Sequence, residues 1–447
     1  MTKDMTTGSP LRIILLFSIP VLLGNLFQQF YNMVDTIIVG RYLGEEALAA
    51  VGSTGCLMFL VLGFANGIAQ GFGVMVSHAF GAKDFKLLRH YVALSLILTL
   101  IISLLLTIPT VTASRLLLAW MHTPENIISM ADAYIKVIFA GILLTMAYNV
   151  LSGILRGIGD SRTPLYFLIL SSVLNIILDV VLIVYTGLGT AGAAYATIIA
   201  QGVSAVLCFF YMYRKYDILR TRHEDYYLDS VGVKNMLAIG VPMALNYSIT
   251  AIGTMIMQSA VNVFGSSVVA AFTAASKVSN IATQSMPTLG TAMATYCGQN
   301  LGAGKYDRIC AGMRQGLFLC FGAAATAAAI CIFGGRFIVS WFVSNPSEEI
   351  FSSAMQYLTI ASWFFLPLAM IFLYRNALQG LDQGLIPMLS GVIELACRFG
   401  VIALVPASTG FFGVCFADPA AWAGAGIPLF VTYLLWEHRM KQCPKAA

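Results

Sequence analysis

Two carboxylates lie inside apolar stretches of this sequence, where an ionisable side chain is costly and usually serves a function. Asp35 comes near the end of an apolar run that begins around Leu11, and Asp179 closes the segment LNIILD. If both runs are helices, with a rise of about 1.5 Å per residue, each carboxylate lies roughly 9 Å from the nearer end of its helix. We therefore expect Asp35 and Asp179 to share one depth.

Two neutral oxygen donors are expected at this depth. Asn175 lies four residues before Asp179 and hence on the same helical face. Thr197 lies at a similar depth in the next apolar segment. The four residues offer hard oxygen donors that suit a sodium ion. Alternatively, the two carboxylates take up a proton, because neighbouring buried carboxylates cannot both ionise cheaply.

The residues leave Na+ and H+ open as the ion of this site. A purely structural role for the two carboxylates is the alternative hypothesis. In that case Asp35 and Asp179 would be permanently protonated packing groups, or they would pair with Lys136, which also lies within an apolar segment.

The elements that position these residues are expected to be membrane-spanning helices. Of the 447 residues, 59% are hydrophobic and only 10% are charged, whereas about a quarter of the residues of a soluble domain are charged. About 20 apolar residues cross a bilayer as a helix. The sequence thus predicts an all-α integral membrane protein with twelve transmembrane helices, at residues 11–40, 46–76, 90–112, 128–155, 163–185, 190–213, 232–262, 267–296, 308–343, 350–378, 386–408 and 414–437.

The sequence also repeats itself. SHAFGAKDFKLLRH (77–90) aligns with GQNLGAGKYDRICA (298–311), and RGIGDSRTP (156–164) aligns with QGLDQGLIP (379–387). Pro20 has its counterpart in Pro242. We expect two homologous six-helix lobes joined by a cytoplasmic linker: an N-lobe at 1–213, the linker at 214–231 and a C-lobe at 232–447. Parallel repeats of this kind are typical of transporters.

The distribution of basic residues predicts the topology. Eighteen Lys and Arg residues flank the predicted helices on one side, and only Arg41, Arg115 and Arg336 flank them on the other. Because basic residues accumulate on the cytoplasmic side, both termini should be cytoplasmic in a multi-pass protein of the cell (inner) membrane. Topology explains the basic residues, so we expect no nucleic-acid partner.

Motifs of catalysis are missing from the sequence. It contains no G-x-x-x-x-G-K-[ST], no H-E-x-x-H and no G-x-S-x-G. Its nine cysteines show no C-x-x-C spacing, which argues against a thiolate metal site. We therefore expect neither an enzyme nor a cofactor.

The C-lobe carries a second set of charges within its predicted helices. Glu394 and Arg398 lie four residues apart, so they are expected to form an ion pair on one helical face. The alternative is that they contact a substrate together with Lys277.

The segments PVLLGNLFQQFYNMVDTIIVG, RGIGDSRTP and LNIILD, in two six-helix halves, resemble the multidrug and toxic compound extrusion (MATE) transporters of the MOP flippase superfamily, in particular the DinF-like branch. The resemblance implies that Asp35, Asn175, Asp179 and Thr197 form the cation site of the N-lobe. It also implies a helix bend at Pro20. The acidic C-lobe residues of the NorM-like branch, in the seventh and tenth helices, have no counterpart here, so coupling should reside in the N-lobe.

The leading functional hypothesis is a secondary antiporter that works by alternating access. The resemblance implies that it exports amphipathic, often cationic drugs or toxic organic compounds in exchange for H+ or Na+. We expect a monomer in the lipid bilayer, with small organic molecules as substrates. One alternative is a flippase for lipid-linked oligosaccharides, for which the three cations Lys136, Lys277 and Arg398 are few. A structural or sensory membrane protein is the alternative of another class.

Overall fold

The computed structural model describes residues 4–342, 347–404 and 409–442. These ranges are helical almost throughout and contain no strand, so the prediction of an all-α protein is confirmed. Nine of the helices there are long and apolar enough to cross a membrane, and two bent helix pairs raise this number to as many as eleven. The chain is a multi-span membrane protein.

Contacts between helices divide the chain into two units. Unit 1 contains Ile19–Ser248, and unit 2 contains Met5–Ser18 together with the chain from Ile249 onward. Two helices are shared, since α1 (Pro10–Leu43) passes from unit 2 into unit 1 and α8 (Ser230–Asn262) passes from unit 1 into unit 2.

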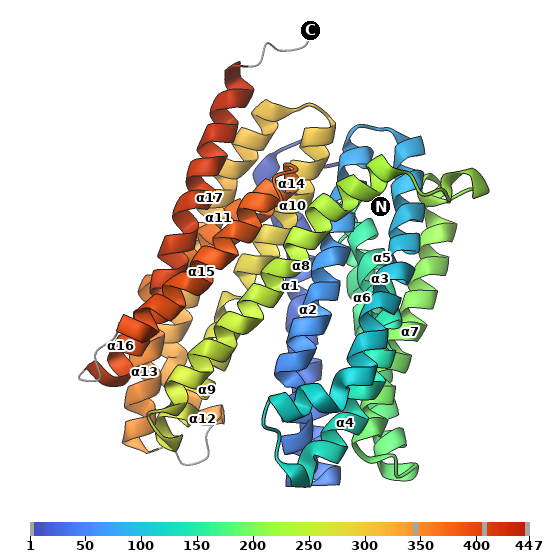
Figure 1. Cartoon of the computed structure of the whole chain (residues 1–447). Helices are drawn as coiled ribbons and strands as arrows, with labels where there is room; N and C mark the ends of the chain where they lie inside the picture. The colour runs from blue at the N-terminus through green and yellow to red at the C-terminus, as the bar shows by residue number, and fades with distance from the viewer. Residues whose placement is uncertain (1–3, 343–346, 405–408, 443–447) are drawn as a thin grey trace. The chain divides into compact units, whose positions relative to one another are not determined.

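Between α1 and α8, unit 1 holds six α-helices and three short helices of other kinds. They are α2 (Glu45–Gly81), α3 (Phe85–Trp120), α4 (Glu125–Ala140), α5 (Ile142–Gly157), α6 (Arg162–Val180), the π-helix η1 (Val181–Tyr185), α7 (Gly189–Lys215), and the 3-10 turns η2 (Asp217–Leu219) and η3 (His223–Asp225). Within this unit α2 packs against α5, and α6 packs against α7 (Figure 1).

Unit 2 continues after α8 with a similar series. It contains α9 (Ser266–Thr283), α10 (Ser285–Gly302), α11 (Tyr306–Ala329), the π-helix η4 (Ile330–Gly334), α12 (Gly335–Phe342), α13 (Glu348–Trp363), α14 (Phe365–Gly380), α15 (Leu385–Leu404), α16 (Gly410–Val414) and α17 (Ala417–Gln442). Within it α10 packs against α14, and α15 lies beside α17 (Figure 1).

Breaks within three of the predicted helices explain why twelve were predicted, whereas nine of the described helices are long and apolar enough to cross a membrane without a break. The predicted helix 128–155 is bent by 47° between α4 and α5, and 350–378 by 53° between α13 and α14. The predicted helix 267–296 is divided into α9 and α10 around Gln284. The predicted ends at 343 and at 405–408 lie outside the described residues.

The internal repeat is visible in the helix boundaries. One constant offset along the chain carries both bounds of α4 and of α5 onto those of α13 and α14, and it also carries the start of α6 onto the start of α15. Both copies bend at the same place, after Ala140 in one and after Trp363 in the other. The duplication therefore preserved the helix breaks as well as the sequence motifs.

Glycines hold the first half of α8 against α2 within unit 1. A Cβ atom on Gly71 would lie 2.4 Å from the Cα of Gly240, and one on Gly67 would lie 2.5 Å from the Cα of Ala244. Such backbone contact is the usual role of small residues between membrane helices. Any larger side chain at Gly67 or Gly71 would force the two helices apart.

The segment before α1 is anchored within unit 2. Met5 is fully buried, and its backbone N–H donates to Gln299 Oε1 at 2.9 Å. The guanidinium of Arg308 donates to the carbonyl oxygens of Met5 at 3.1 Å and Gly8 at 2.9 Å, and Lys305 Nζ donates to Thr6 O at 2.8 Å. The segment before α1 is thus fixed to α10 by a neutral hydrogen bond and to the beginning of α11 by charge-assisted ones.

The linker at 214–231 packs against the start of α3 within unit 1. His90 is 5% exposed and lies with its Nε2 2.7 Å from Asp229 Oδ1 and its Nδ1 3.0 Å from Asp225 O. Its ring stacks on Tyr227 with the centroids 4.1 Å apart. These contacts hold the linker to the N-terminal end of α3.

Asp160 caps the start of α6 in the motif RGIGDSRTP. Its Oδ1 accepts from the backbone N–H groups of Arg162 and Thr163, at 3.1 Å each, and its Oδ2 accepts from the hydroxyls of Thr163 and Tyr216. Burial alone would raise the pKa of this carboxyl, but the hydrogen bonds from Thr163 and Tyr216 outweigh it and hold the pKa below its ordinary value.

The anchored N-terminal segment yields a stability prediction. We expect Arg308→Met to lower the apparent melting temperature in detergent, because its guanidinium donates several charge-assisted hydrogen bonds to the segment before α1, from partly buried to exposed positions, each worth about 1 kcal/mol. The matched control is Arg314→Met on the same helix, whose side chain is 71% exposed and lies 3.6 Å from Glu437. Such a surface pair contributes about 1 kcal/mol or less. Equal shifts for the two variants would contradict the anchoring role.

The cap at Asp160 yields a pH-dependent prediction. A carboxyl whose pKa is lower in the folded state stabilises the fold above its unfolded pKa of about 3.9 and loses this contribution as the pH falls below it. We expect Asp160→Asn to melt at a lower temperature than the wild type at pH 7, and the gap to narrow as the pH is lowered below about 4. Asp217→Asn, at a side chain 81% exposed, is the control and should change little. A gap that does not vary with pH would contradict the role of the charge.

Candidate cation site

The four residues predicted to form a cation site all lie within unit 1. Asp35 is on α1, Asn175 and Asp179 are on α6, and Thr197 is on α7. Asp179 is fully buried and Asn175 is 2% exposed, whereas Asp35 and Thr197 are partly buried. The residues are therefore in the interior of a helix bundle and not on its lipid-facing side.

The structure brings these side chains together in pairs. Asn175 Nδ2 donates to Thr197 Oγ1 at 3.3 Å, which joins α6 to α7. The carboxyl groups of Asp35 and Asp179 are close enough to interact electrostatically, which links α1 to α6. The four residues that were predicted from sequence to share one depth thus lie near one another, in two pairs, on three helices.

Four acceptor oxygens of this cluster are buried with no hydrogen-bond partner among the residues that the structure describes. They are Asp35 Oδ1, Asn175 Oδ1 and both carboxylate oxygens of Asp179. Buried polar atoms are normally satisfied, and an unpaired buried charge is strongly disfavoured. The arrangement fits a bound cation or a proton, either of which would supply the missing positive charge.

Two tyrosines adjoin the carboxylates, and the sequence analysis did not single them out. Tyr31 lies four residues before Asp35 on α1, and Tyr134 lies on α4; both interact electrostatically with Asp35 and Asp179. The spacing of four could have indicated Tyr31. Nothing in the sequence indicates Tyr134, which comes from another helix.

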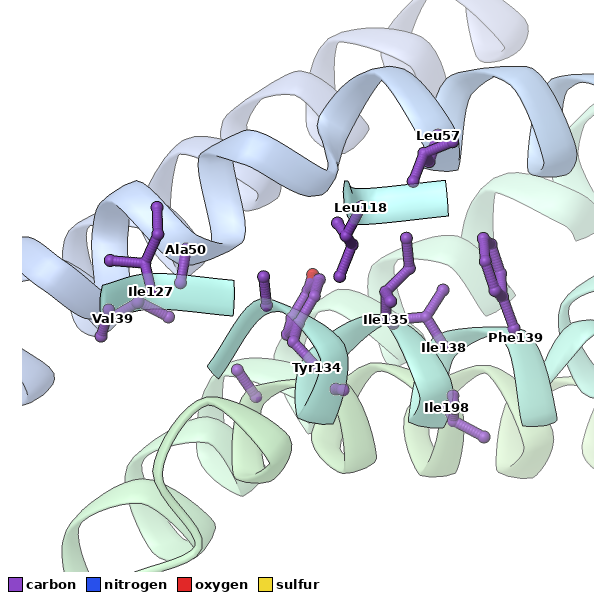
Figure 2. Close-up of a cluster of buried hydrophobic side chains, with 14 of the residues drawn as sticks. Val39, Ala50, Leu57, Leu118, Ile127, Tyr134, Ile135, Ile138, Phe139 and Ile198 are labelled. Atoms are coloured by element: carbon purple, nitrogen blue, oxygen red, sulfur yellow. The ribbon is translucent and has the colours of Figure 1, made fainter. Parts of the chain in front are cut away.

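Tyr134 is held by a hydrophobic cluster in unit 1. Figure 2 shows its ring among Leu118, Ile135, Ile138 and other apolar side chains, and Tyr134 itself is 4% exposed. Close packing of this kind fixes a side chain in one rotamer and excludes water. Tyr134 is therefore held in a fixed position in the packed interior of unit 1.

The helix that carries Asp179 changes its hydrogen bonding immediately after the site. The π-helix η1 begins at Val181, two residues beyond Asp179. Short π-helical segments inside α-helices occur frequently at functional sites. The π-helical turn, which is wider than an α-helical one, thus follows directly after Asp179, whose carboxylate oxygens have no hydrogen-bond partner among the described residues.

Lys136 has a carboxylate partner other than Asp35 and Asp179. Its Nζ lies 2.6 Å from Asp132 Oδ2 one turn earlier on α4, and Asp132 Oδ1 accepts from Ser114 Oγ at 2.6 Å. Because Asp132 neutralises Lys136, the structure gives no support to the alternative in which this lysine balances Asp35 or Asp179.

The charges predicted in the C-lobe are placed in unit 2. Glu394 and Arg398 form the expected i,i+4 ion pair at 3.0 Å, and both are 6% exposed. Lys277 lies on α9 with an exposed side chain. The ion pair belongs to a larger buried network with Arg375 and Asp418, which the sequence analysis missed because these residues lie on other helices.

Fold and site together define a multi-span, all-α membrane protein built from two copies of one helical repeat; among the described residues, the unpartnered buried carboxylate oxygens lie in one copy. The MatE family model matches the chain twice, over residues 20–181 and 242–404. The chain belongs to this family, which consists of membrane transport proteins, and the resemblance to the MATE transporters is confirmed.

Individual relatives cover nearly the whole chain. The probable multidrug resistance protein YpnP of Bacillus subtilis is 30% identical over 417 residues, which are 92% of this chain and 92% of that protein. The FAD transporter of Shewanella oneidensis is 25% identical over 413 residues, which are 90% of this chain and 88% of that protein. A solved outward-facing structure of a multidrug resistance MATE family transporter of the MOP superfamily shares the fold, with a TM-score of 0.90, 24% identity, and coverage of 99% of this chain and 99% of that one.

The unpartnered carboxylate at Asp179 yields a stability prediction at pH 8 without sodium. We expect Asp179→Asn to leave the apparent melting temperature unchanged or to raise it, because the variant removes a buried carboxyl group whose two oxygens have no hydrogen-bond partner among the described residues. Asp132→Asn is the matched control and should lower the melting temperature, since Asp132 is paired with Lys136 and Ser114. A loss for Asp179→Asn as large as for Asp132→Asn would mean that Asp179 is held by a structural partner.

Proposed function

We propose that this protein is a secondary antiporter that exports amphipathic, often cationic organic compounds in exchange for H+ or Na+ by alternating access. The observation that carries the proposal is the group of four buried acceptor oxygens on Asp35, Asn175 and Asp179 without hydrogen-bond partners in the described part of the chain. In a family of transport proteins, such a group is suited to bind and release a coupling ion.

The proposed substrates rest on the relatives and not on a bound molecule. YpnP, named a probable multidrug resistance protein, matches 92% of this chain. A relative named as an FAD transporter shows that the same fold is associated with a chemically different cargo. We propose drug-like organic compounds because of the 30% identity to YpnP, against 25% for the FAD transporter.

Coupling requires that the ion change the energy of one conformation relative to another. An ion shifts a conformational equilibrium only by its differential affinity for the two states. A proton or sodium ion arriving from outside would neutralise Asp35 and Asp179 after substrate release and so favour the return step. A pair that cannot change its charge could not couple ion entry to export.

Pro20 is the proposed bending point of α1. Proline lacks a backbone N–H and therefore leaves a gap in the helical hydrogen bonds where a helix bends easily. Pro20 lies two residues beyond Ser18, where α1 passes from unit 2 into unit 1. A bend there would let the anchored start of α1 stay in unit 2 while the part bearing Asp35 moves with unit 1.

The topology and the assembly state are also proposals. The uneven distribution of Lys and Arg between the two sides supports cytoplasmic termini in a cell membrane protein. We propose a monomer, since each chain carries a complete set of the residues assigned to the ion site. The DinF-like branch remains a prediction from the sequence.

The flippase alternative receives less support. An anionic lipid headgroup needs unneutralised basic residues, whereas two of the three cations considered, Lys136 and Arg398, are paired with Asp132 and Glu394, and Lys277 has an exposed side chain. The charge of Lys136 and Arg398 is therefore not available to an anionic substrate.

The decisive experiment is uphill dye efflux from proteoliposomes under separately imposed proton and sodium gradients. We expect Asp35→Asn and Asp179→Asn to reduce efflux at least tenfold while substrate binding persists, because asparagine mimics the protonated carboxyl but cannot titrate. Thr197→Ala removes a neutral ligand and should weaken sodium-driven efflux more than proton-driven efflux.

Glu348→Gln supplies the matched control, because it makes the same kind of change at a side chain that is 75% exposed. It should leave efflux unchanged. Normal uphill efflux by Asp35→Asn under both gradients would show that the carboxylate is structural and that the proposed coupling is wrong.

A further inference from the structure

Unit 2 contains a buried chain of five side chains from four helices. Arg375 Nη2 on α14 lies 2.9 Å from Glu394 Oε2 on α15. Arg398 Nη2, also on α15, lies 3.0 Å from Glu394 Oε1, and Arg398 Nε lies 2.8 Å from Asp418 Oδ1 on α17. The hydroxyl of Tyr357 on α13 donates to Asp418 Oδ2 at 2.9 Å.

The charges of this network cancel, since it contains two guanidinium groups and two carboxylates. All four charged residues are buried, with exposed fractions from 6% to 9%, and Tyr357 is 4% exposed. Arg398 is the central member, since it contacts both carboxylates. Breaking a buried pair by removing one partner leaves an uncompensated charge, which is strongly disfavoured.

The internal repeat relates this network to the cation site of unit 1. The offset that carries the start of α6 onto the start of α15 places Arg398 at the position of Asn175. The same offset carries α4 onto α13 and places Tyr357 at the position of Tyr134. In each unit, therefore, the tyrosine interacts with carboxylates inside the helix bundle: electrostatically with Asp35 and Asp179 in unit 1, and through a hydrogen bond to Asp418 in unit 2.

The position that corresponds to Tyr31 makes room for the guanidinium. When α1 and α8 are aligned on their prolines, Pro20 and Pro242, Tyr31 corresponds to Gly253. A Cβ atom on Gly253 would lie 2.5 Å from Nη1 of Arg398. Compared with unit 1, unit 2 thus has arginine in place of asparagine on α15 and glycine in place of tyrosine on the facing part of α8.

We propose that Arg398 is a built-in cation: its guanidinium fills, in unit 2, the place that an exchangeable cation takes in unit 1. Unit 2 then binds no coupling ion of its own, and each chain carries a single exchangeable site. The comparison with unit 1 rests on the proposed function, whereas the occupied network in unit 2 is observed directly.

The proposal predicts that removing Arg398 creates a cation site. Without its guanidinium, Arg375 is left with Glu394 and Asp418, a net charge of −1, and Tyr357 and the carboxylates offer oxygen ligands. Asparagine is the informative replacement, because it is the residue that unit 1 has at the corresponding position. A small monovalent cation or a proton would then restore neutrality.

The test uses purified full-length protein that carries Asp35→Asn and Asp179→Asn, so that the site of unit 1 is silent. Binding of radioactive sodium is measured at pH 8, and bound protons are counted by titration between pH 5 and pH 9. We expect no saturable sodium binding with Arg398 in place. Adding Arg398→Asn should introduce about one sodium ion or one additional proton per chain, because one negative charge is left uncompensated.

Two further variants separate the outcomes. Arg398→Lys keeps a positive charge and should bind no ion, and adding Glu394→Gln and Asp418→Asn to Arg398→Asn should abolish the new site. Should Arg398→Asn fail to fold, the background with Arg398 in place still tests the proposal, because saturable ion binding there that depends on Glu394 and Asp418 overturns it. A folded Arg398→Asn protein that gains neither a sodium ion nor a proton overturns it equally.

The failure of this inference can be told apart from failure of the proposed function. If Asp35→Asn with Asp179→Asn still binds sodium and the added Glu394→Gln and Asp418→Asn do not change that binding, the site of unit 1 has been assigned wrongly. If binding in that background depends on Glu394 and Asp418, Arg398 does not occupy the site and the present inference is wrong.

Discussion

A carboxylate in the interior of a membrane helix bundle needs a compensating positive charge, because low-dielectric surroundings penalise an isolated ion heavily. The two units meet this requirement differently. In unit 2, Glu394 and Asp418 are compensated by guanidinium groups of the same chain. In unit 1, Asp179 has no hydrogen-bond partner for either oxygen among the described residues. This difference is the basis of our proposal that unit 1 takes up an ion or a proton from solution, whereas unit 2 is neutral by itself.

Both units derive from one repeat, and their helices diverged less than their polar residues. The bends after Ala140 and after Trp363 occur at equivalent positions, and tyrosines stand at equivalent positions on α4 and α13. Several polar positions differ between the copies: Asn175 corresponds to Arg398 and Ser171 to Glu394, whereas Asp179 corresponds to Ile402. The same helical framework therefore carries a different set of buried charges in each unit.

Two helices, α1 and α8, are shared between the units, and α1 carries Asp35 of the candidate cation site. Gly67 and Gly71 hold the first half of α8 against α2, whereas Arg308 and Lys305 hold the segment before α1 within unit 2. The start of α1 is thus anchored in unit 2 and the start of α8 in unit 1, and each helix then continues into the other unit. Pro20, near this passage in α1, interrupts the helical hydrogen bonds between the anchored start and Asp35.

The sequence by itself determined the all-helical membrane class, the duplication, the four residues of the candidate cation site and the Glu394–Arg398 pair. Apolar run length, repeated motifs and a spacing of four residues are local properties that a sequence displays directly. Only the tertiary structure decided that Tyr134 interacts with the two carboxylates and that Asp418 and Arg375 complete the network around Arg398. These contacts join residues on different helices, and helix packing, which no local spacing encodes, brings them together.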